Sequence, residues 1–94
     1  MPVVVLVPKE KSDERRVAAT PESVRHLVKN RLEVRVERNA GAAACFSDGD
    51  YEAAGATLVS SPAWSEADVI LKVGAPDPSE AEEMKEGALL VAFL

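Results

Sequence analysis

The feature that most constrains the fold is a continuous aliphatic run, Val3–Val7, near the start of the 94-residue chain. Its length and its β-branched side chains are typical of a central strand that is buried on both faces. Further strand-like runs are Leu32–Glu37, Ala56–Val59, Val69–Leu71 and Ala88–Leu94. Because helix-like stretches separate these runs, the sequence predicts a parallel α/β sheet in a single domain, residues 1–94.

The stretches between the runs begin with side chains that cap helices. Thr20 precedes Pro21, which fits the first helical position, and the helix places His26 opposite its apolar stripe, facing solvent. Ser47-Asp48-Gly49-Asp50 is a variant of the capping box, and Gly55 would end that short helix. Further caps at Ser61-Pro62 and Asp77-Pro78 predict a turn that holds Trp64 and a helix that reaches Glu86.

The pattern within each strand suggests where it lies in the sheet. Leu32–Glu37 alternates apolar and charged side chains, so one face is wet, and we expect an edge strand. Ala88–Leu94 is mostly aliphatic and central in character. We therefore predict a flavodoxin-like three-layer sandwich with a five-stranded parallel sheet in the order 2-1-3-4-5. Because no covering helix follows the fifth strand, we expect the domain to be incomplete, truncated after that strand.

Composition excludes several classes of partner and site. Acidic residues outnumber basic ones by 16 to 11, which opposes binding to nucleic-acid phosphates. Cys45 is the single cysteine, so the sequence offers no internal disulfide and no cluster with metal-ligand spacing. The run Val3–Val7 is too short for a signal core or a membrane span. We expect a cytoplasmic chain without a metal site.

The sequence also lacks the motifs of nucleotide binding and of hydrolysis. No Gly-x-Gly-x-x-Gly motif occurs, and one histidine leaves no Ser-His-Asp set. The turn after the first strand is Pro8-Lys9-Glu10, where a dinucleotide site needs glycine for the backbone to approach the pyrophosphate. We predict no catalytic and no cofactor-binding residue in this chain, and no binding of a nicotinamide nucleotide by the chain alone.

Two cations are the candidate ligand-binding residues. In open α/β sheets ligands bind beyond the carboxyl ends of the strands, which the order 2-1-3-4-5 would place between strands one and three. Arg16 lies in the charged loop after strand one, and Lys72 ends strand four. Together they would hold an anion, or each would pair with a nearby acid such as Glu10 or Glu14. Spacing leaves both alternatives open for Arg16, whereas Lys72, in an aliphatic strand end, needs a partner.

Several motifs, in order and at matching spacing, resemble the alanine dehydrogenase and transhydrogenase alpha-subunit superfamily. The motifs are Pro8-Lys9-Glu10, Glu14-Arg15-Arg16-Val17-Ala18-Ala19-Thr20-Pro21, Ala40-Gly41, Phe46-Ser47-Asp48, Tyr51 through Ala56, Ile70-Leu71-Lys72-Val73 and Ala75-Pro76. Within the superfamily, Arg-Val-Ala-Ala-Thr-Pro and Leu-Lys-Val-x-Ala-Pro look more like transhydrogenase than alanine dehydrogenase. Arg31 and Asn39 stand where relatives often have glycine, and Asn30 or Asn39 would supply the left-handed turns.

The resemblance implies a parent oxidoreductase that transfers hydride between NAD(H) and NADP(H), coupled to proton translocation. It implies as partners an NAD-binding Rossmann domain in the rest of the alpha subunit, an NADP-binding domain, a membrane part and a second copy in a homodimer. The parent would lie at the cytoplasmic face of the inner membrane. In alanine dehydrogenases, the alternative parent, the residues matching Arg16 and Lys72 hold pyruvate, and a catalytic histidine follows the fifth strand. The non-enzyme alternative is a flavodoxin-like interaction module; the chain alone is expected to be inactive.

Overall fold

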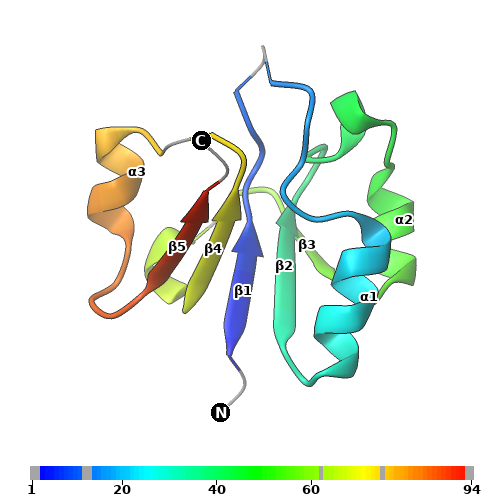
Figure 1. Cartoon of the computed structure of the whole chain (residues 1–94), viewed down its shortest axis with the longest axis horizontal. Helices are drawn as coiled ribbons and strands as arrows, with labels where there is room; N and C mark the ends of the chain where they lie inside the picture. The colour runs from blue at the N-terminus through cyan, green and yellow to red at the C-terminus, as the bar shows by residue number, and fades with distance from the viewer. Residues whose placement is uncertain (1–2, 12–13, 62, 75, 93–94) are drawn as a thin grey trace.

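The computed structural model describes residues 3–11, 14–61, 63–74 and 76–92. Within them the chain alternates strands and helices around one parallel sheet (Figure 1). The strands are β1 (Val4–Val7), β2 (Glu33–Glu37), β3 (Thr57–Val59), β4 (Val69–Lys72) and β5 (Leu89–Ala92). The helices are α1 (Pro21–Lys29), α2 (Asp48–Ala53) and α3 (Pro78–Glu83), with short 3-10 turns η1 (Ala42–Ala44) and η2 (Trp64–Glu66). The predicted five-stranded parallel α/β sheet is confirmed.

The order of the strands is β3-β2-β1-β4-β5, which corrects the expected order 2-1-3-4-5. β3 pairs with β2 rather than with β1, and β4 takes the place beside β1. β2 is therefore internal, although its residues alternate in polarity. Its polar face is satisfied because Arg35 donates to Glu33 at 2.7 Å and to Glu66 of η2 at 2.8 Å. Alternation thus marked one wet face of β2 and not an edge of the sheet.

The two edges of the sheet are β3 and β5. β5 had been expected to be central in character, but Leu89 is 58% exposed and the strand pairs only with β4 among the described strands. The helix before it, α3, ends at Glu83 rather than at Glu86. Residues 93 and 94, the end of the predicted strand Ala88–Leu94, lie outside the described residues.

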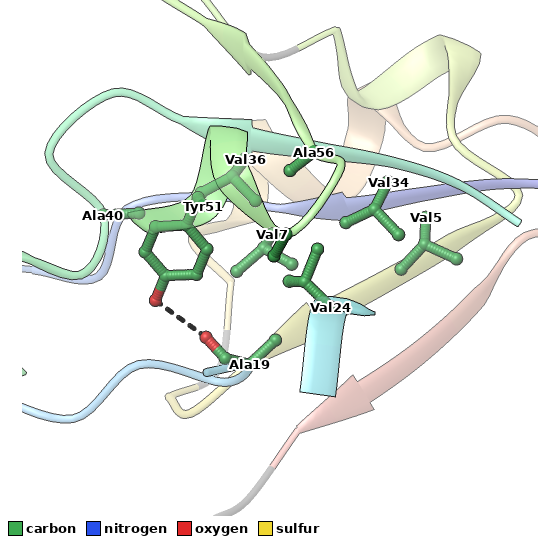
Figure 2. Close-up of a cluster of buried hydrophobic side chains, with 10 residues drawn as sticks. Val5, Val7, Ala19, Val24, Val34, Val36, Ala40, Tyr51 and Ala56 are labelled. Carbon is green, nitrogen blue, oxygen red and sulfur yellow. Dashed lines mark hydrogen bonds between the residues drawn. The ribbon is translucent and has the colours of Figure 1, made fainter. Parts of the chain in front are cut away.

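Helices cover the two faces of the sheet unequally. α1 and α2 lie on one face and α3 lies on the other (Figure 1). The face under α1 and α2 holds the larger apolar cluster, in which Val24 of α1 and Tyr51 of α2 pack against strand valines (Figure 2). The opposite face holds a smaller cluster that includes Trp64 of η2. Its members are Leu6, Trp64, Ala67 and Ile70.

Capping bonds define the helix starts that the sequence predicts. The backbone N–H of Ser23 donates to Thr20 Oγ1 at 3.1 Å, and Pro21 occupies the first turn of α1. At α2 the capping box is complete, because Asp50 N donates to Ser47 Oγ and Ser47 N donates to Asp50 Oδ2. These two helix starts are confirmed. The predicted cap at Ser61-Pro62 is wrong for the turn that holds Trp64, because η2 begins after Ala63 without a side-chain capping bond; Pro62 itself lies outside the described residues.

The turns after α1 and β2 contain residues in the left-handed region. Asn39 has a φ of 65°, as expected, but the turn after α1 uses Arg31, with a φ of 68°, while Asn30 keeps a φ of −88°. Asn30 is instead the C-cap residue that follows α1, where its side chain donates to the carbonyl of His26 at 2.8 Å. Arg31 therefore holds a conformation that costs about 1 kcal/mol for a residue with a side chain.

Tyr51 fixes the end of the long loop between β1 and α1. Its hydroxyl, buried beneath α2, donates to the carbonyl oxygen of Ala19 at 2.8 Å (Figure 2). Burial, followed by the nearby carboxylates of Asp48 and Asp50, raises the pKa of Tyr51 to about 12. The ring lies so close to Gly41 that a Cβ atom there would stand 2.6 Å from Tyr51 Cε2. Glycine at position 41 is thus required by packing against this ring.

Candidate functional site

The candidate site lies where β1 and β4 end side by side. These strands pair in parallel, so the loops that follow them leave the same edge of the sheet. β1 leads toward β2 on one side, and β4 leads toward β5 on the other. The strand order therefore reverses between β1 and β4, and not between strands one and three as the expected order implied. Ligands of open α/β sheets bind at such a point.

Glu10, in the loop after β1, joins the two strand ends. Its Oε2 accepts a hydrogen bond from the backbone N–H of Val73 at 2.9 Å, and its Oε1 accepts one from Gly74 at 3.1 Å. The Glu10 residue is 8% exposed. A buried carboxylate is stable only when donors or cations satisfy it, and here backbone amides of the neighbouring loop do so.

Lys72, the last residue of β4, is the cation next to this carboxylate. Its Nζ lies 3.5 Å from Glu10 Oε1, and the two side chains are 3% and 4% exposed. The same Nζ lies 6.0 Å from the centroid of the Trp64 ring, within the range of a cation–π contact. The prediction that Lys72 needs a partner is confirmed, and the partner is Glu10.

Arg16, the second candidate, lies in the exposed part of the loop. Its side chain is 69% exposed, and its Nε and Nη2 donate to the two carboxylate oxygens of Glu14 at 2.8 and 3.2 Å. The side-chain and backbone hydrogen bonds from Arg16 lower the pKa of Glu14 to about 2. The side-chain hydrogen bonds to Glu14, followed by the charge of that carboxylate, raise the pKa of Arg16. Of the two alternatives that spacing left open for Arg16, the structure has the pairing with Glu14.

A cleft of about 490 Å³ opens beside these residues. Its walls come from the loop after β1 and from the segment after β2 that includes η1. The lining residues are Lys9, Glu10, Lys11, Glu14, Asn39, Ala40, Ala42 and Ala43. The two acids that neutralise Lys72 and Arg16 thus line the cleft, while the two cations themselves are not among its lining residues. Sequence reasoning missed the wall from Asn39 to Ala43: Ala40-Gly41 was noted only as a family motif, and the segment carries no charged side chain that would indicate a ligand site.

The remaining chemistry-bearing residues lie apart from the cleft. His26 is exposed on α1, as predicted, and Cys45 is exposed at the end of η1. Among the described residues no group of three or more His, Cys, Asp or Glu side chains is arranged to hold a metal ion. No helix in the described part of the chain has the length and apolar character to cross a membrane.

The strand order 3-2-1-4-5, with charged loops where it reverses, defines a doubly wound α/β domain, a class of fold in which ligands bind at that reversal. Residues 6–94 match the family model described as Alanine dehydrogenase/PNT, N-terminal domain. The chain belongs to this family, as the motif resemblance predicted.

Individual relatives come from both branches of the family. The chain is 42% identical over 93 residues to the NAD(P) transhydrogenase subunit alpha of Haemophilus influenzae, a match that covers 98% of the chain and 18% of that protein. It is 44% identical over 93 residues to the alanine dehydrogenase of Halomonas elongata, covering 96% and 25%. The chain therefore spans a quarter or less of the length of these relatives.

Solved structures give the same result for the fold. The transhydrogenase from Sinorhizobium meliloti superimposes with a TM-score of 0.90 at 37% identity, covering 97% of this chain and 27% of that one. An L-alanine dehydrogenase superimposes with a TM-score of 0.87 at 41% identity, covering 96% and 26%. Both branches thus share this domain architecture.

Proposed function

We propose that the chain is the N-terminal domain of a nicotinamide nucleotide transhydrogenase alpha subunit. The parent would transfer hydride between NAD(H) and NADP(H) and couple this transfer to proton translocation. The match over nearly the whole chain to a transhydrogenase alpha subunit at 42% identity supports such a parent, and two motifs carry the choice of branch. The motifs Arg16 to Pro21 and Leu71 to Pro76 favour this branch over the alanine dehydrogenases.

We assign the chain the role of one wall of a ligand cleft. The turn after β1, where a dinucleotide-binding domain places glycine and pyrophosphate, holds the buried carboxylate of Glu10. A carboxylate repels pyrophosphate, and α1 begins only at Pro21, so its N-terminus is not placed directly after β1 to receive a phosphate. NAD(H) would therefore be bound by a second, Rossmann-type domain outside this chain, with NADP(H) bound by a further domain of the complex.

The partners follow from that role. The cleft at the β1/β4 edge would close against the NAD-binding domain of the same subunit. A second copy would form a homodimer, and the membrane part would hold the complex at the cytoplasmic face of the inner membrane. Arg16 and Lys72 remain the candidate anion-binding residues. Arg16 would exchange Glu14 for a ligand carboxylate by the same two-pronged geometry.

The alternative parent is an alanine dehydrogenase, which the 44% identity to the Halomonas elongata enzyme supports equally. In that case Arg16 and Lys72 would face the carboxylate and carbonyl of pyruvate. Two assays on the full-length protein separate the alternatives. Hydride transfer from NADPH to an NAD analogue supports the transhydrogenase, whereas pyruvate- and ammonium-dependent oxidation of NADH with no such transfer would overturn it in favour of the dehydrogenase.

The isolated chain is predicted to be inactive and not to bind NADH. Calorimetric titration with millimolar NADH should give only heats of dilution, because the turn after β1 offers a carboxylate in place of glycine. Saturable binding with micromolar affinity would contradict the assignment of the nucleotide site to another domain. A non-enzymatic role as an interaction module would instead require that the full-length protein fail in both hydride-transfer assays.

A further inference from the structure

The carboxylate of Glu10 is locked to the end of β4. Its two hydrogen-bond donors, the N–H groups of Val73 and Gly74, are the two residues that follow Lys72 in the chain. The carboxylate therefore cannot move relative to the backbone of Lys72 without losing both bonds. These two backbone hydrogen bonds fix the position of the carboxylate independently of the Lys72 side chain.

The contact between Glu10 and Lys72 is of a different kind. At 3.5 Å it is longer than the roughly 2.7–2.9 Å of a charge-assisted hydrogen bond, whereas the bonds of Glu10 to the amides are shorter. Glu10 thus places a fixed negative charge near Lys72 without forming a short hydrogen bond to its ammonium. The Trp64 ring contacts the ammonium as well, and the lysine side chain is only 3% exposed. The ammonium is therefore enclosed by the carboxylate and the ring.

We infer that Glu10 is a positioning residue, which holds the Lys72 side chain in a fixed place beside the cleft. This inference rests on the proposed function, because it takes Lys72 to act on a ligand in the cleft. Glu10 itself lines the cleft. Lys72 does not line the cleft, so a ligand would meet Glu10 first, and the place of the lysine behind that carboxylate is the one that Glu10 and the β4 amides impose.

Lysine labelling in the full-length protein tests whether Glu10 holds Lys72. Brief treatment with acetic anhydride, followed by peptide mass spectrometry, compares the acetylation of Lys72 with that of exposed Lys29. In the Glu10→Gln variant the ammonium loses its counter-charge and moves toward water, because a buried unpaired charge is unfavourable. We expect acetylation of Lys72, relative to Lys29, to rise on the order of tenfold, as a 1.4 kcal/mol preference would give.

Glu14→Gln is the matched control, since it removes one carboxylate from the same cleft but from an exposed pair. It should leave the labelling of Lys72 unchanged. Glu10→Asp serves in place of Glu10→Gln if that variant does not fold: its shorter side chain moves the carboxylate away from the β4 amides, so a rise in Lys72 labelling is expected here too. Equal labelling of Lys72 in the wild-type and Glu10 variants would overturn the inference.

A double-mutant cycle on kcat/KM, in whichever hydride-transfer assay the full-length protein supports, tests whether this holding matters for function. Glu10→Gln and Lys72→Met should each lower kcat/KM by about ten- to a hundredfold, as other orienting partners do. The double variant should be no worse than Lys72→Met, because Glu10 acts through Lys72. Additive losses would overturn the positioning role alone. An unchanged kcat/KM in Lys72→Met would overturn the role of Lys72 in the proposed site, and the inference with it.

Discussion

Two acid–base pairs lie at the same edge of the sheet and differ in burial and in geometry. Arg16 and Glu14 form short bonds of 2.8 and 3.2 Å, yet the arginine side chain is 69% exposed. Lys72 and Glu10 are 3.5 Å apart, yet both side chains are at most 4% exposed. Short bonds in water contribute little because solvent screens them, whereas a long contact in the interior cannot be replaced by water. Burial, rather than distance, decides which pair the fold depends on.

The strongest test of this comparison removes the buried acid. Glu10→Ala leaves Lys72 without its partner and takes the acceptors from two backbone amides. We expect the free energy of unfolding to fall by about 3–5 kcal/mol, the usual cost of breaking a buried pair from one side. Urea unfolding of the purified chain, followed by the fluorescence of Trp64 beside Lys72, measures it. A loss below about 1 kcal/mol would place the buried pair in the same class as the exposed one.

A smaller loss of stability is expected when the bond that anchors the end of the β1–α1 loop is removed. Tyr51→Phe deletes the bond to the carbonyl of Ala19 and leaves that buried acceptor unpaired, at a cost of about 1–3 kcal/mol. The wild-type chain should also lose stability between pH 10 and about 12. The raised pKa of Tyr51 in the folded state keeps its contribution intact only below the ordinary value of 10.0.

Circular dichroism at increasing pH distinguishes the two effects in Tyr51→Phe. The variant should begin less stable than the wild type and should lack this part of the alkaline loss. If wild type and variant lose stability in parallel above pH 10, Tyr51 is not the group responsible.

The smallest effect on stability is expected for the exposed pair. Arg16→Ala should leave the urea midpoint of the chain unchanged, since the arginine is largely in water. It should nevertheless raise the pKa of Glu14 from about 2 toward its ordinary value of 4.5, because the hydrogen bonds from Arg16 are the largest cause of the shift. Carboxyl-carbon NMR titration of Glu14 shows this directly. A shifted urea midpoint would mean that the exposed pair also supports the fold.

The class of fold was predictable because its signals are local. Aliphatic runs and capping residues such as Thr20 and Ser47 act within a few positions, and the structure has the helices that they predict. Strand order was not predictable in the same way. Arg35 satisfies the polar face of β2 through Glu66, 31 positions along the chain, and no pattern within β2 reveals that partner.

The candidate site was predictable only where its signals are local in the sequence. A lysine at the end of an aliphatic strand demands a counter-charge, so Lys72 could be singled out and Glu10 named among its possible partners. The amide bonds of Glu10 depend on β4 lying beside β1, which the expected order did not provide. The uncharged wall of the cleft, Asn39 to Ala43, follows from how the chain turns after β2 and has no chemical signature in the sequence.

The bond between Glu10 and Val73 joins residues that are 63 positions apart. As the polypeptide leaves the ribosome, Glu10 emerges early and its donors emerge only after three further strand segments. Closing so long a loop is entropically costly and slow compared with forming α1 or pairing β1 with β2. Until β4 pairs with β1, we expect the Glu10 carboxylate to be hydrated, because its amide donors and Lys72 are not yet in place. We therefore expect the site to be assembled late in folding, so that an intact Glu10–Lys72 contact would report that β4 has paired with β1.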